Sequence, residues 1–70
     1  MNNITRLKSL MWEYHALDLY VKKHWNYIYE SLKSHNKTEG VNYWCGVILN
    51  DIRDTFPKTY KQSELFIESR

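Results

Sequence analysis

The chain has 70 residues, a formal net charge of +2 and one cysteine, and 43% of its residues are apolar. This apolar content excludes a disordered tail, and the length allows one small domain, residues 1–70. The net charge is too small to indicate a polyanionic partner by itself, and a single thiol excludes an internal disulfide. The start, MNNITRLKSL, lacks the apolar core of a signal peptide, and no segment is long enough to span a membrane. We therefore expect a cytoplasmic protein.

The first predicted element is one long helix over residues 4–34. Apolar residues recur at helical spacing along one face, and neither glycine nor proline interrupts residues 3–35. This pattern predicts that the face packs in the core. The predicted core face of this helix consists of Ile4, Leu7, Leu10, Met11, Tyr14, Leu17, Val21, Trp25, Ile28, Tyr29 and Leu32.

A second amphipathic helix is predicted over residues 41–56, after the polar loop SHNKTEG. Pro57 is expected to end it, because proline cannot continue the hydrogen-bond ladder. Residues 58–70 then form a short C-terminal element, helical or irregular. The predicted fold is all-α: a long N-terminal helix and a shorter second helix form an antiparallel hairpin, with the C-terminal element packed across it. The apolar face of the second helix consists of Val41, Trp44, Cys45, Ile48, Leu49, Ile52 and Phe56.

A second seam of bulky side chains lies opposite the core face of the long helix. One interpretation is that the C-terminal element covers this seam as additional core. The other is a partner-binding surface for a larger protein or a second copy of the chain, because Trp and Tyr are enriched in interface hot spots. The seam consists of Trp12, Ala16, Leu19, Tyr20, Lys23 and Tyr27.

A row of basic residues beside the core face suggests an alternative function, a small nucleic-acid-binding protein. Lysines in a row can follow phosphates, with an aromatic ring available for stacking. The simpler interpretation is that these lysines extend over the apolar face into water. A helix lying on an anionic membrane is a further alternative, which rings on two faces fit poorly. The candidate nucleic-acid contacts are Lys8, His15, Lys22, Lys23 and Lys33.

Few residues suggest chemistry. Asp18 interrupts the core face; it either pairs with Lys22, four residues along, or is a buried or interfacial carboxylate paired with Arg53 or a partner. Cys45 lies in an apolar face, where a thiol is usually inert. The histidines lack metal-ligand spacing, and no triad or phosphate loop is present. We therefore expect no enzyme activity, metal or cofactor.

These patterns predict a small protein-binding module that blocks or bridges a surface on a larger protein. In size and composition the chain is similar to small helical modulators that are common among phage and mobile-element products. This similarity covers no motif, and it implies a regulator or inhibitor of a larger host protein.

Overall fold

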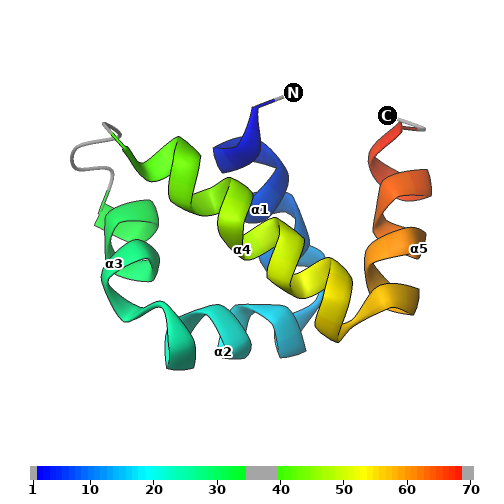
Figure 1. The fold of residues 1–70 in the computed structure, drawn as a ribbon, viewed down its shortest axis with the longest axis horizontal. Coiled ribbons are helices and arrows are strands. Elements are labelled where there is room, and N and C mark those ends of the chain that lie inside the picture. The colour runs from blue at the N-terminus through cyan, green and yellow to red at the C-terminus, as the bar shows by residue number, and fades with distance from the viewer. Residues whose placement is uncertain (1, 35–39, 69–70) are drawn as a thin grey trace.

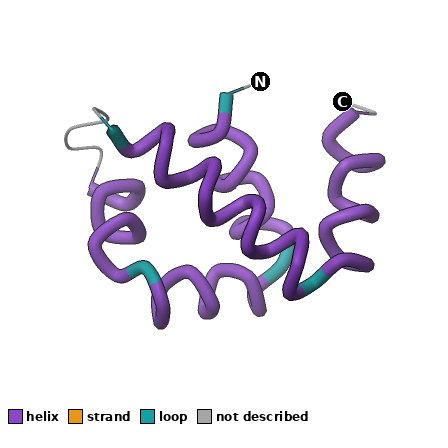
Figure 2. Tube along the Cα trace, viewed as in Figure 1, coloured by secondary structure: helices purple, strands orange, loops and turns teal. Residues whose placement is uncertain are grey.

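The computed structural model describes residues 2–34 and 40–68, with side chains described as far as Leu65. Within these residues every regular element is an α-helix, so the predicted all-α class is confirmed (Figure 1, Figure 2). The helices in chain order are α1 (Asn3–Glu13), α2 (His15–His24), α3 (Asn26–Ser34), α4 (Val41–Thr55) and α5 (Pro57–Glu68).

The single helix predicted over residues 4–34 is wrong, because the chain bends at Tyr14 and Trp25 and forms three helices. The backbone φ angles there are −123° and −130°, outside the helical range. A straight helix over the same residues would be about 46 Å long, whereas the longest dimension of the chain is 29 Å. The bends thus let α1, α2 and α3 form an arch, and α4 crosses it (Figure 1).

The two bends keep much of the helical hydrogen-bond ladder. The Tyr14 amide donates to the Leu10 carbonyl at 2.9 Å, and the Tyr14 carbonyl accepts from the Asp18 amide at 3.2 Å. At the second bend the Trp25 amide donates to the Val21 carbonyl at 2.7 Å. Each bend therefore leaves few backbone groups without a partner, so better packing can outweigh its cost.

The antiparallel hairpin is also not formed, because α4 lies across the arch. It packs most extensively on α1 and also contacts α3. The predicted second helix, 41–56, is confirmed as Val41–Thr55. Both predicted apolar faces supply the core, while Ile4, Tyr14, Trp25, Tyr29 and Phe56 are only partly buried against it. The buried core consists of Leu7, Leu10, Met11, Leu17, Val21, Ile28, Leu32, Val41, Cys45, Ile48, Leu49, Ile52 and Tyr60.

The C-terminal element is a helix, α5, which packs on α4 and α1. Phe56 is the C-cap of α4, and Pro57 is the first residue of α5, a position where proline is favourable because its missing N–H would have no helical partner. Arg6 Nη2 and Glu64 Oε1 lie 3.3 Å apart and join α1 to α5. Across the described residues, no helix has both the length and the apolar character required to cross a lipid bilayer.

Candidate functional site

Four aromatic side chains from α3, α4 and the second bend form a surface cluster, which we call the aromatic patch: Trp25, Tyr27, Tyr43 and Trp44. Trp44 is central, with its ring centroid 6.0 Å from Trp25, 6.1 Å from Tyr27 and 5.5 Å from Tyr43. The Trp25 and Tyr27 centroids are 6.3 Å apart. These separations lie in the range of favourable aromatic pairs.

The patch exists because the second bend brings the start of α3 beside the first turn of α4. Trp25 is partly buried against the core and anchors the group. The other three rings remain accessible, since Tyr43 is 69% exposed, Tyr27 54% and Trp44 39%. The patch is therefore fixed on one side by the core and open to solvent on the other.

The two segments that build the patch contain no charged side chain. Residues 25–29 read WNYIY and residues 40–50 read GVNYWCGVILN. The centres of protein interfaces are likewise depleted of charged residues and enriched in Tyr and Trp. This composition suits contact with another protein surface better than contact with phosphates, which requires cations.

The two bends divide the single helix on which the partner-binding seam was predicted. The seam residues therefore lie on three helices, and only Tyr27 belongs to the aromatic patch. Trp12 and Leu19 are 86% and 51% exposed, and Ala16 and Lys23 are also exposed. The interpretation that α5 buries the seam therefore does not hold for these residues, since α5 packs on α4 and α1 instead.

Tyr20 differs from the rest of the seam because its contacts lie within the chain. Its hydroxyl donates a hydrogen bond to Asp51 of α4. Its ring contacts Phe56 edge to face at 5.3 Å and stacks on His24 at 4.4 Å. The hydrogen bond to Asp51, helped by partial burial, raises the pKa of Tyr20 above its ordinary value. Tyr20 thus joins α2 to α4.

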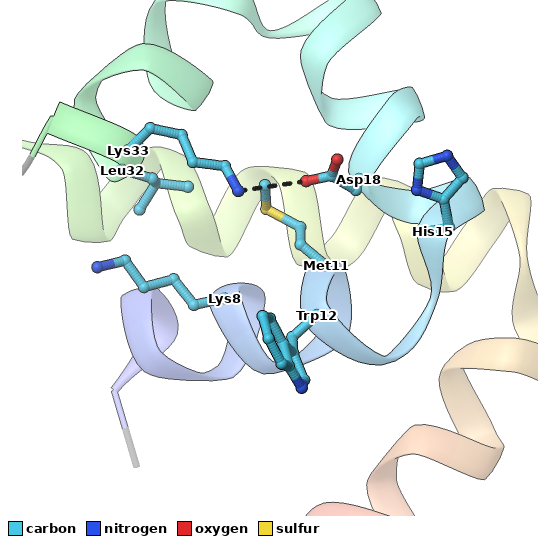
Figure 3. Close-up of a pocket in the computed structure, with 7 residues that line it drawn as sticks. All are labelled: Lys8, Met11, Trp12, His15, Asp18, Leu32 and Lys33. Atoms are coloured by element: carbon cyan, nitrogen blue, oxygen red, sulfur yellow. Dashed lines mark ion pairs between the residues drawn. The ribbon is translucent and has the colours of Figure 1, made fainter.

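A pocket of about 600 Å³, which we call the helix-bend pocket, lies within the arch (Figure 3). It gathers three of the candidate nucleic-acid contacts, Lys8, His15 and Lys33. The other two do not line the pocket: Lys22 lies 5.9 Å from the centre of the Tyr29 ring, which Lys33 also approaches, and Lys23 is exposed on α2. The predicted straight row is therefore not present. The pocket is lined by Lys8, Met11, Trp12, His15, Asp18, Leu32 and Lys33.

The two pairings of Asp18 predicted within the chain, with Lys22 and with Arg53, are wrong, while pairing with a partner stays a prediction. The Asp18 carboxylate lies 3.7 Å from Lys33 Nζ (Figure 3) and accepts a long hydrogen bond, 3.5 Å, from the Tyr29 hydroxyl. The second bend turns α3 back toward the start of α2. Lys33 therefore reaches Asp18 and takes the place that was predicted for Lys22 or Arg53. The Lys33 ammonium also lies 5.1 Å from the centre of the Tyr29 ring.

Cys45 is fully buried in the core. Burial raises its pKa to about 11, an effect that the positive charge of Lys8 partly offsets. Among the described residues no three His, Cys, Asp or Glu side chains converge to hold a metal ion. His35, one of the three histidines considered from the sequence, lies outside the described residues.

Tyr43 was not among the predicted site residues, and Trp44 was predicted to pack in the core on the apolar face of its helix, whereas it is 39% exposed. Two signals could have indicated the patch. Tyr43 lies off the apolar face of its helix, next to a Trp and within a long uncharged segment. Large rings on the edge of a core face often remain partly exposed, because a small core cannot enclose them.

Comparison with known proteins identifies no relative from which a role could be inferred. The function must therefore be inferred from the residues of the chain itself. The chain matches no protein-family model, no curated protein and no solved structure.

Proposed function

We propose that the chain is a protein-binding module that uses its aromatic patch to occupy or bridge a surface on another protein. The patch is the single observation that carries this proposal. It combines a ring anchored in the core, Trp25, with three accessible rings that present hydroxyl and indole groups. Such side chains bury a large area at a low rotamer cost and so dominate binding energies at interfaces.

The size of the patch supports an interaction role. With about 200 Å² for each ring residue, the exposed fractions of Tyr27, Tyr43 and Trp44 leave roughly 300 Å² accessible. This is in the range of the largest apolar patch on a typical monomer, which is often functional. In a standard interface each partner buries about 800 Å², and the accessible area of the patch is more than a third of that value.

The nature of the partner follows from the absence of charge in the segments that build the patch. Glu30 and Lys33 line a surface pocket together with Tyr27, so a protein partner would meet uncharged rings with charged groups at their edge, as in the core and rim of an interface. The partner is a larger protein or a second copy of the chain, and binding would act by blocking or bridging. The nucleic-acid alternative has less support, because Lys33 is paired with Asp18 and this carboxylate lies among the basic candidates.

The experiment that tests this proposal compares Tyr27→Ala and Tyr43→Ala with a matched control, Leu65→Ala. Leu65 is 66% exposed on α5 and lies outside the patch. Sedimentation velocity over a concentration series first determines whether a second copy is the partner. A photo-crosslinking phenylalanine analogue at position 43, which keeps an aromatic ring there, then captures partners from lysate with and without nuclease treatment, and each unlabelled variant is added as competitor.

We expect wild type and Leu65→Ala to compete equally well, whereas each patch variant should compete about 30-fold more weakly, as for a hot-spot loss of about 2 kcal/mol. Raising the salt concentration from about 50 to about 200 mM should change binding little, in contrast to phosphate binding. Equal competition by the patch variants and Leu65→Ala would refute the patch as the interface. Nuclease-sensitive capture would support nucleic acid instead.

A further inference from the structure

The helix-bend pocket has the dimensions and the apolar base of a small-ligand site. Its volume of about 600 Å³ lies within the usual range for ligand pockets, about 300–1,000 Å³. Met11 and Leu32, both core residues, supply its apolar base, and Trp12 stands beside them with 86% of its surface exposed. An apolar ligand group could therefore contact an already ordered surface and shield a ring that now faces water.

The charged groups of the pocket favour an anion on that apolar ligand. Lys8 extends from α1 and forms no ion pair with any residue that the structure describes. Lys33 extends from α3 and is held 3.7 Å from Asp18 (Figure 3). The pocket thus offers one unpaired ammonium and a second that is partly neutralised, which suits a single negative charge.

Other ligand classes fit this arrangement less well. A polyphosphate or nucleic-acid backbone would bring several negative charges against the Asp18 carboxylate, where the proposed ligand brings one, and would gain little from Met11 and Leu32. A cationic ligand would be repelled by Lys8 and Lys33. We propose that the helix-bend pocket binds an apolar group that carries one carboxylate, either a free carboxylic acid or the C-terminus of a peptide with an apolar last residue. This inference does not depend on the aromatic patch.

The test is a titration of isotope-labelled protein, followed by NMR at the Trp12 indole N–H and the Met11 methyl group. The probes are 4-phenylbutyrate, its neutral amide, and a short acetylated peptide ending in Leu with either a free or an amidated C-terminus. Both free carboxylates should shift the Trp12 and Met11 signals, and the amides should bind about tenfold more weakly. Binding of only one free carboxylate identifies the source, a small acid or a chain terminus.

Three variants establish the role of the charges. Lys8→Gln should weaken carboxylate binding about tenfold, whereas Lys58→Gln, the same change on α5, should have no effect. Asp18→Asn should strengthen binding several-fold, because it removes a like charge and releases Lys33 to the ligand. Trp12→Ala removes an exposed ring without disturbing the core, and should weaken binding through the apolar contact.

The inference is overturned if millimolar carboxylate leaves the Trp12 and Met11 signals unchanged. It is also overturned if Lys8→Gln and Lys58→Gln weaken binding equally, or if Asp18→Asn weakens it. Circular dichroism of each variant separates lost binding from lost folding. Should Lys8→Gln unfold, the Asp18→Asn and Trp12→Ala results still decide the question, since they have opposite expected signs.

Discussion

Replacement of Gly46 by alanine tests how α1 is held against α4. Gly46 lies inside α4, where alanine is usually more stable than glycine by about 0.5–1 kcal/mol. Here, however, a methyl group on Gly46 would lie 2.7 Å from Asn3 Nδ2. That nitrogen donates to the Asn42 carbonyl at 3.1 Å, so the Asn3 side chain would have to leave its hydrogen bond.

The two effects have similar size and opposite sign. The lost hydrogen bond costs about 0.5–1.5 kcal/mol, while the second contact, from the Asn3 amide to Asn42 Oδ1 at 3.0 Å, does not involve the displaced side chain. Gly46→Ala alone should therefore change the free energy of unfolding by less than about 0.5 kcal/mol. In an Asn3→Ala background the clash is absent, and the same substitution should stabilise the protein by about 0.5–1 kcal/mol.

Urea denaturation followed by circular dichroism on the four proteins of this double-mutant cycle measures the coupling between the two sites. The expected coupling energy is about 0.5–1.5 kcal/mol. Equal stabilisation by Gly46→Ala in both backgrounds would show that Asn3 does not occupy the space above Gly46. Destabilisation in both backgrounds would show that another part of α1 lies there.

Three further predictions concern the core and its titratable groups. Ile48→Ala should lower the free energy of unfolding by about 2–5 kcal/mol, because Ile48 is fully buried. Trp12→Ala should change it by less than about 0.5 kcal/mol, because Trp12 is exposed. Urea denaturation of both variants measures the two values. Cys45 is buried and its pKa is raised to about 11, so its alkylation rate at pH 8 should be proportional to the fraction of unfolded protein. This rate should therefore rise in Ile48→Ala. Rapid alkylation of the native protein would contradict the burial of Cys45. Tyr20→Phe should cost about 1 kcal/mol by removing the hydrogen bond to Asp51. The pKa of Tyr20 in the folded state is raised from 10.0. The hydrogen bond therefore stabilises the fold fully below about pH 10, and this stabilisation disappears as the pH rises through the folded-state pKa. Melts at increasing pH should show a smaller loss of stability in the alkaline range for Tyr20→Phe than for wild type.

The core of this fold was largely predictable from the sequence, because burial follows the spacing of apolar residues. Leu7, Leu17, Val21 and Ile28 lie on one helical face, and each is buried as expected. The pattern of burial continues across both bends, from Leu10 through Leu17 and Val21 to Ile28. Periodicity therefore predicted which residues are inside without predicting the direction of the helices.

The bends were missed because no glycine or proline marks them. The signal that was available is charge. Lys22, Lys23 and His24 occupy the last turn of α2, and Asp18 lies in its first turn, the distribution that a helix dipole favours at its two ends. Without the bends the candidate site could not be predicted, since Trp25 meets Trp44 only after the chain has turned.

The division of the arch into short helices has a consequence for cooperativity. Helices α1, α2 and α3 contain 11, 10 and 9 residues, below the about 12–15 residues at which an isolated helix begins to persist in water. Each therefore depends on burial against the rest of the molecule. In the bent form, undocking of α4 removes the surface that supports all three, so secondary and tertiary structure are lost together. We therefore expect a sharp, all-or-none unfolding transition as a consequence of the same two bends that shorten the helices.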